Sequence, residues 1–170
     1  MPEMELFTPR LRIIPLNAGL LAALLRSGDD FDAELGLARS ESDLVGHERE
    51  AMQWLHDQAV CHPDQFPWYA RWQIILREEN RSVGSACFKG PPDHGGEVEM
   101  GYGIEEAHRN RGYMTEAARA LCDWALKQPG VRCVLAVTDE LNIPSHKVCG
   151  NCGMTLSGKM ADGLPWRRYA

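Results

Sequence analysis

Apolar and polar residues alternate along several short stretches of the chain, a pattern typical of half-buried β-strands. The clearest stretch is residues 97–104, where every second residue from Val98 to Ile104 is apolar or aromatic. Further strands are predicted over residues 6–16, 68–76, 82–88, 154–160 and 164–169, and the apolar run 131–138 predicts a buried strand.

Helical periodicity marks the segments that lie between these strands. Four leucines within residues 18–26 follow Asn17, which is a good N-cap, and predict a helix there. We expect further helices over residues 48–60 and 115–127 and after Asn142, short helical turns within 27–45, and loops over 61–67 and 89–96. Leading helices, a meander of strands and then strand–helix–strand units predict a mixed α/β sheet in one three-layer domain.

The composition is that of an ordinary globular protein. Of 170 residues, 44% are hydrophobic and 25% charged, which predicts one domain over residues 1–170. No segment approaches the roughly 18 uncharged apolar residues of a membrane span, and residues 1–5 resemble no secretory leader. We therefore expect a cytoplasmic protein with no membrane partner. The net charge of −6 argues against a nucleic-acid partner, which would require a basic excess.

The cysteines are expected to be free thiols. Four of the six fall inside predicted strands or helices, where free Cys acts as a small hydrophobic residue. Cys149 and Cys152 follow His146 closely and raise the alternative of a zinc site. A structural zinc site usually has four ligands in paired clusters, and no second pair is present. We therefore expect no metal.

A basic loop directly follows the strand at residues 97–104. It carries Arg109, Arg111 and Gly112, and the predicted helix begins at Thr115. The first N–H groups of a helix have no partner inside the helix and carry partial positive charge. Glycine allows a ligand to approach the backbone, and arginine adds charged donors. This arrangement is typical of a phosphate-binding loop, although a solvated turn with surface arginines would have the same sequence.

Motifs on both sides of this loop resemble the GNAT superfamily of N-acetyltransferases, and most closely the branch of the ribosomal-protein N-terminal acetyltransferases. The pyrophosphate loop of that branch, Arg/Gln-x-x-Gly-x-Gly/Ala, is matched by Arg109 and Gly112, with Met114 as a departure. The later motif of the branch is matched by Asn142, Ser145, Gly153 and Met154, with Met in place of Phe. Residues 8–16 and 166–169 are similar to the first and last strands of the branch.

The resemblance implies a GNAT-type mixed, mostly antiparallel sheet flanked by helices on both faces. It also implies acetyl-CoA as the co-substrate, with its pantetheine arm along the edge of the strand at residues 97–104. The implied cofactor-binding residues are Tyr102, Gly103, Ile104, Arg109, Asn110, Arg111, Gly112, Tyr113, Met114, Thr115, Asn142 and Ser145. Gly101 and Gly103 interrupt the strand, which fits either a ligand approaching the backbone or a simple bulge.

Acetyl transfer to an amine needs a base, because a charged ammonium has no lone pair. Glu97 and Glu99 share one face of the strand, and we choose Glu99 because it is nearer to the glycines. The alternative is that both carboxylates are solvated charges on the strand face.

The leaving CoA thiolate benefits from a donor. Many GNAT enzymes have a Tyr seven residues after the Asn, where this chain has Cys149. Cys149 could donate a proton, or it could be a small core residue. Ser145 is the better candidate for the CoA sulfur, and helix capping in the first turn is its alternative role.

These residues together predict an acetyl-CoA-dependent N-acetyltransferase that acts by direct transfer in a ternary complex. The expected partner is an amine acceptor, either a small molecule or a protein N-terminus, and a homodimer is left open. A catalytically degenerate acyl-CoA-binding regulatory protein is the alternative from another class. Met114, the missing Tyr, and Asn151 at a place where the family usually has Lys or Arg keep that alternative open.

Overall fold

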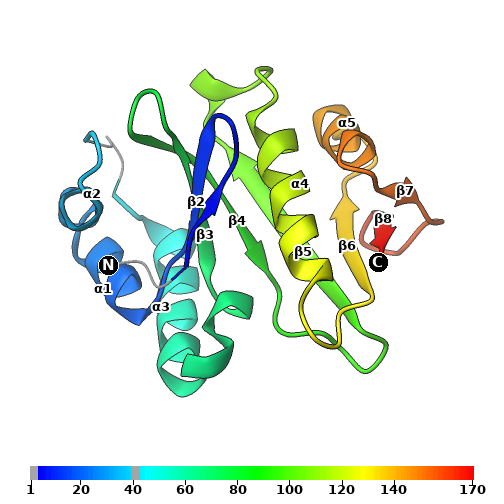
Figure 1. Cartoon of the computed structure of the whole chain (residues 1–170), viewed down its shortest axis with the longest axis horizontal. Helices are drawn as coiled ribbons and strands as arrows, with labels where there is room; N and C mark the ends of the chain where they lie inside the picture. The colour runs from blue at the N-terminus through cyan, green and yellow to red at the C-terminus, as the bar shows by residue number, and fades with distance from the viewer. Residues whose placement is uncertain (1–3, 40–42) are drawn as a thin grey trace.

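The computed structural model describes residues 4–39 and 43–170. Their strands form one eight-stranded sheet in the order β1-β2-β3-β4-β5-β6-β8-β7 (Figure 1), and every neighbouring pair is antiparallel except β5 and β6. The strands are β1 (Leu6–Phe7), β2 (Leu11–Pro15), β3 (Arg71–Leu76), β4 (Arg81–Phe88), β5 (Glu97–Ile104), β6 (Cys133–Thr138), β7 (Thr155–Leu156) and β8 (Leu164–Tyr169).

Helices cover both faces of this sheet, as predicted. α3 lies against the face of β4 that carries Ser85 and Cys87, whereas Tyr102, on the other face of β5, reaches α5. α4 crosses the sheet on the near side in Figure 1. The helices are α1 (Ala18–Arg26), α2 (Gly28–Leu35), α3 (Gly46–Cys61), α4 (Tyr113–Leu126) and α5 (Ile143–Asn151), with short 3-10 turns at η1 (Pro63–Trp68) and η2 (Glu106–His108). The predicted mixed α/β fold is confirmed.

The sheet opens between β5 and β6. Their parallel pairing covers only the three positions from Glu97 to Glu99. Beyond Glu99, β5 continues to pair with β4 as far as Ile104, while β6 continues beside β8 as far as Thr138. The two strands therefore diverge within one sheet, and the last part of β5 presents an edge to the gap.

Several predicted boundaries were wrong for local reasons. α4 begins at Tyr113, two residues before the predicted start, because the Tyr113 and Met114 side chains are buried against the core. Residues 61–67 are not a loop: Pro63 stands at the first position of η1, where its missing N–H costs nothing. Residues 6–16 form two strands, since the Thr8 and Leu11 backbones bond to each other and turn the chain.

Two further observations concern the N-cap of α1 and the length and apolar character of the helices. Leu20 N–H donates to Asn17 Oδ1 at 3.0 Å, which confirms the predicted cap of α1. Within the described residues, no helix combines the length and the apolar character that crossing a bilayer would require.

Candidate active site

A cleft of about 720 Å³ lies where β5 and β6 diverge, and we call it the β5–β6 cleft. It brings together every predicted cofactor-binding residue except Arg111: Tyr102, Gly103, Ile104, Arg109, Asn110, Gly112, Tyr113, Met114, Thr115, Asn142 and Ser145. Sequence reasoning missed five other lining residues, which are His108, Pro144, Lys147, Val148 and Asn151. Pro144, Lys147 and Val148 lie beside Ser145 in the first turns of α5, so their proximity could have been predicted from the helix itself.

The start of α4 has the local structure of an anion site. Asn110 and Gly112 adopt positive φ angles of 62° and 79°, which turns the chain sharply into the helix. No side chain of the described residues caps the α4 N-terminus. Its first-turn N–H groups therefore have neither an intrahelical acceptor nor a capping side chain there, and they lie at the β5–β6 cleft.

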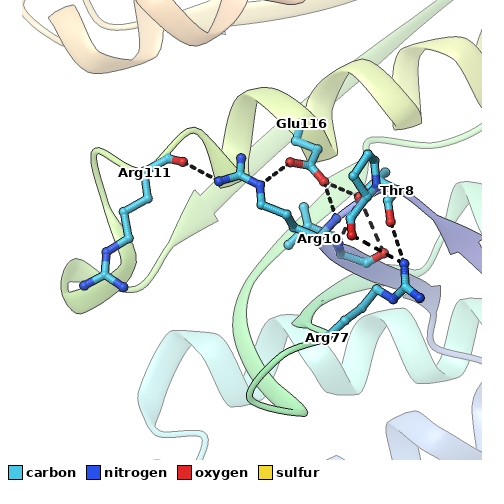
Figure 2. Close-up of polar contacts among 7 residues, drawn as sticks. Thr8, Arg10, Arg77, Arg111 and Glu116 are labelled. Carbon is cyan, nitrogen blue, oxygen red and sulfur yellow. Dashed lines mark hydrogen bonds and ion pairs between the residues drawn. The ribbon is translucent and has the colours of Figure 1, made fainter.

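Arg10 ties this loop to the beginning of β2 (Figure 2). Its guanidinium contacts Glu116 Oε2 at 2.7 Å, donates to the Arg111 carbonyl at 2.8 Å, and lies 4.5 Å above the Tyr113 ring. The Arg111 side chain extends away from Arg10 and Glu116 in Figure 2. Arg111 is not among the residues that line the β5–β6 cleft, and its role in cofactor binding remains a prediction.

Glu116 is the centre of this network. The Thr8 hydroxyl and the Arg10 backbone N–H donate to Glu116 Oε1 at 2.5 and 2.9 Å. Burial raises the pKa of Glu116, but the hydrogen bonds from Thr8 and Arg10 outweigh it and lower the pKa overall. Sequence reasoning missed the network, because Thr8 and Glu116 are 108 residues apart along the chain.

A hydroxyl pair faces the other side of the β5–β6 cleft. Tyr102 Oη lies 2.9 Å from Ser145 Oγ and 3.3 Å from Cys149 Sγ. Ser145 N–H donates to Asn142 Oδ1 at 3.3 Å, so Asn142 caps α5 as predicted and Ser145 stands in its first turn. Tyr102 was predicted to act only through its backbone. Its side chain was missed because the sequence does not show which helix that strand face meets.

Cys149 is a core residue in this structure. It is fully buried and does not line the cleft. Burial raises the pKa of the Cys149 thiol to about 11, and burial also raises the pKa of Tyr102. Both groups are therefore protonated at neutral pH. The geometry favours the core alternative for Cys149 over direct contact with a ligand.

A second cavity of about 360 Å³, which we call the α3 pocket, lies over the α3-facing side of β4 and β5. It shares Tyr102 and Gly103 with the β5–β6 cleft. The β4–β5 register runs without a break past both glycines, so the simple bulge is wrong. A side chain at Gly103 would project into open space. The glycines therefore keep this part of the pocket free of side chains.

The two candidate bases have different surroundings. Lys89 Nζ contacts Glu99 Oε1 at 2.6 Å, and Arg167 Nε contacts Glu97 Oε2 at 2.8 Å. Glu99 thus contacts a residue that lines the α3 pocket, Lys89, whereas Glu97 contacts Arg167 of β8. Neither glutamate is itself a lining residue of the α3 pocket, and the choice of Glu99 over Glu97 remains a prediction.

The suggested zinc ligands do not gather at one point. His146 Nε2 lies 2.9 Å from the Asp139 carbonyl, and its ring packs against Trp166. Cys149 and Cys152 are both buried. Among the residues that the structure describes, no three His, Cys, Asp or Glu side chains are grouped as metal ligands.

The family model of the acetyltransferase (GNAT) domain matches residues 10–155, which is most of the chain. The protein therefore belongs to the GNAT family. It is an N-acetyltransferase, a kind of acyltransferase. The Bacillus subtilis (strain 168) protein named uncharacterized N-acetyltransferase YjdG is 29% identical over 159 residues, which cover 94% of each chain.

Solved structures share this fold at low sequence identity. Ribosomal-protein-S5-alanine acetyltransferase from Vibrio fischeri has a TM-score of 0.72 at 13% identity, covering 98% of this chain and 97% of that one. Mycobacterium smegmatis RimJ, solved in complex with CoA-disulfide, has a TM-score of 0.66 at 17% identity, covering 94% of this chain and 82% of that one. The predicted family and fold are confirmed, and the structural neighbours include ribosomal-protein acetyltransferases.

Proposed function

We propose that the protein transfers the acetyl group of acetyl-CoA to a primary amine, directly and within a ternary complex. The observation that carries this proposal is the meeting of two cavities at one strand: the β5–β6 cleft and the α3 pocket both include Tyr102 and Gly103. An acyl donor in the cleft and an amine in the pocket would meet beside the backbone of β5. Such proximity removes the need for an enzyme nucleophile.

The features of the β5–β6 cleft are suited to binding acetyl-CoA, the acetyl donor. The α4 N-terminus and the Arg109 side chain would hold the pyrophosphate. The exposed edge of β5 at residues 102–104 would bind the pantetheine arm and donate an N–H to the thioester oxygen. The complex of RimJ with CoA-disulfide supports a CoA ligand for this fold.

Different side chains around β5 deprotonate the amine and stabilise the leaving thiolate. Glu99 takes a proton from the acceptor ammonium, directly or through water, so that the amine can attack the acetyl carbon. The new C–N bond forms as the C–S bond breaks, and the second proton that the nitrogen then releases protonates the departing thiolate to give free CoA. Ser145 donates a hydrogen bond to the departing thiolate, and the Tyr102 hydroxyl, 2.9 Å from Ser145 Oγ, holds Ser145 in place.

A thiol-release assay tests this function. The protein is incubated with acetyl-CoA and a panel of amines that includes small molecules and peptides with free N-termini, and free CoA is measured with a thiol reagent. Amine-dependent release, with acetylated product seen by mass spectrometry, supports the proposal. Thermal stabilisation by acetyl-CoA without release for any amine would favour the acyl-CoA-binding regulator instead.

A further inference from the structure

Arg71 is a cation of the α3 pocket with no carboxylate in direct contact among the described residues, although Glu48 and Glu105 favour its charged form from a greater distance. The pocket lining includes two cationic side chains, Arg71 and Lys89, and Glu99 neutralises Lys89. Within residues 4–39 and 43–170, Arg71 forms no ion pair. Its Nε donates to Gln73 Oε1 at 2.9 Å, and its Nη1 approaches Met52 Sδ at 4.0 Å. A guanidinium has five N–H donors, so most of those of Arg71 remain available to the pocket.

The surroundings of Arg71 are mainly apolar. The pocket wall includes Met52, Leu55 and Phe88, and the exposed Trp54 lies on the same helix. Burial lowers the pKa of Arg71 from its usual value, although not enough to discharge it at neutral pH. A charge removed from water in this way is costly unless it is paired. An anion in the α3 pocket would supply the direct contact that Glu48 and Glu105 do not make.

The strand register places Arg71 at a useful distance from the proposed reaction site. Arg71 is the Cα partner of Cys87, and Cys87 is the Cα partner of Gly101. These three residues form one row across β3, β4 and β5, so Arg71 is two strand spacings, about 10 Å, from the backbone of Gly101. One small molecule, or one end of a peptide, can span that distance.

We propose that the acceptor amine carries a carboxylate, which pairs with Arg71 while the amine lies at β5. This substrate class rests on the proposed acetyl transfer. A guanidinium binds a carboxylate through two parallel N–H···O bonds and so orients the acceptor as well as attracting it. In this arrangement the ammonium end of the same zwitterion gives its proton to Glu99, directly or through water, and Glu99 contacts Lys89 of the pocket lining.

Matched acceptor pairs test the proposal without any mutation. Straight-chain ω-amino acids are compared with their primary amides, and peptides with Asp at position two are compared with the same peptides carrying Asn. The amide is nearly isosteric and neutral, so each pair differs in charge alone. We expect the carboxylate member to have a kcat/KM about 10²-fold higher, because the amide leaves Arg71 unpaired. The two arms show whether the carboxylate belongs to a small amine or to a protein N-terminus.

Variants of Arg71 then test whether the carboxylate of the acceptor binds to this residue. Arg71→Gln should remove the preference by raising KM much more for the carboxylate member of each pair than for its amide, and Arg71→Lys should restore part of the preference. Arg81→Gln is the matched control, since Arg81 lies on β4 but does not line the α3 pocket. If Arg71→Gln fails to fold, inhibition of the wild-type enzyme replaces it: simple carboxylates without an amine should compete with the acceptor and not with acetyl-CoA.

The results separate this inference from the function on which it rests. Equal kcat/KM within both kinds of pair, or a preference that survives Arg71→Gln, would overturn the carboxylate while leaving acetyl transfer intact. Binding of acetyl-CoA with no acetylation of any amine would overturn the proposed function and the inference together.

Discussion

Replacing Gly112 with Val tests the phosphate site at the start of α4. Gly112 has a φ of 79°, a region in which a β-branched residue is strained. A Cβ there would also lie 3.3 Å from Arg10 Nη2, which is the end of a flexible side chain. The strain costs about 1–3 kcal/mol of a free energy of unfolding of about 5–15 kcal/mol. The fold should therefore survive.

The effect on the cofactor should be much larger. The Val side chain would stand where phosphate oxygens must approach the first-turn N–H groups. Loss of one or two charged hydrogen bonds, each worth about 1.5–3 kcal/mol, weakens acetyl-CoA binding by about 10- to 10⁴-fold. Isothermal titration calorimetry gives the Kd, and circular dichroism melting shows whether the fold is retained.

Gly36→Val is the matched control. Gly36 also has a left-handed backbone, with a φ of 65°, but it caps α2 and is not part of the β5–β6 cleft. Both variants should lose a similar Tm, about 2–4 °C for each kcal/mol of strain, and only Gly112→Val should lose affinity. A wild-type Kd in Gly112→Val, or an equal loss of affinity in Gly36→Val, would refute the reasoning.

Three further predictions concern individual side chains. Glu99→Gln should lower kcat by about 10²- to 10⁴-fold with little change in acetyl-CoA affinity. The loss of kcat should shrink as the pH rises toward the pKa of the amine. A large loss of kcat in Glu97→Gln alone would identify Glu97 as the base instead of Glu99. Tyr102→Phe should lower kcat while the Kd for acetyl-CoA stays constant, and an unchanged kcat would remove Tyr102 from the mechanism. The pKa of Glu116 is lowered in the folded state. The stabilisation that the ionised carboxylate gives to the fold is therefore complete above the pKa of Glu116 in the unfolded chain, and it is lost as the pH falls through the pKa in the folded protein. The Tm difference between wild type and Glu116→Gln should therefore shrink on acidification below about pH 4.5, the ordinary pKa of a glutamate, and a difference that stays constant would contradict the network.

The features that sequence could predict are local. Asn17 before four leucines, and Gly112 between a strand and a helix, each depend on a few adjacent residues, and both lie where they were expected. The geometry of the loop before α4 could be predicted for the same reason, since its glycine and the first N–H groups of the helix belong to one short segment.

The features that sequence could not predict join distant segments. Arg10 reaches Glu116 across 106 residues, and Tyr102 reaches Ser145 across 43. Arg71 enters the α3 pocket only through the register of three strands. The alternation of apolar and polar residues over 97–104 shows which residues share a face of the strand. The residues that contact each face depend on how α3 and α5 pack against the sheet.

The divergence of β5 from β6 leaves a strand edge in the middle of the sheet, where β5 beyond Glu99 pairs with β4 alone among the described strands. Edges of this kind are normally found at the rim of a sheet, exposed to any strand that can pair with them. Amide hydrogens on this inner edge should therefore exchange rapidly with deuterium in the free protein, in contrast to those shared with β4. Slowed exchange at residues 100–104 on addition of CoA would mean that the ligand completes the sheet, so that the most rigid form of the enzyme is the one already loaded with its donor.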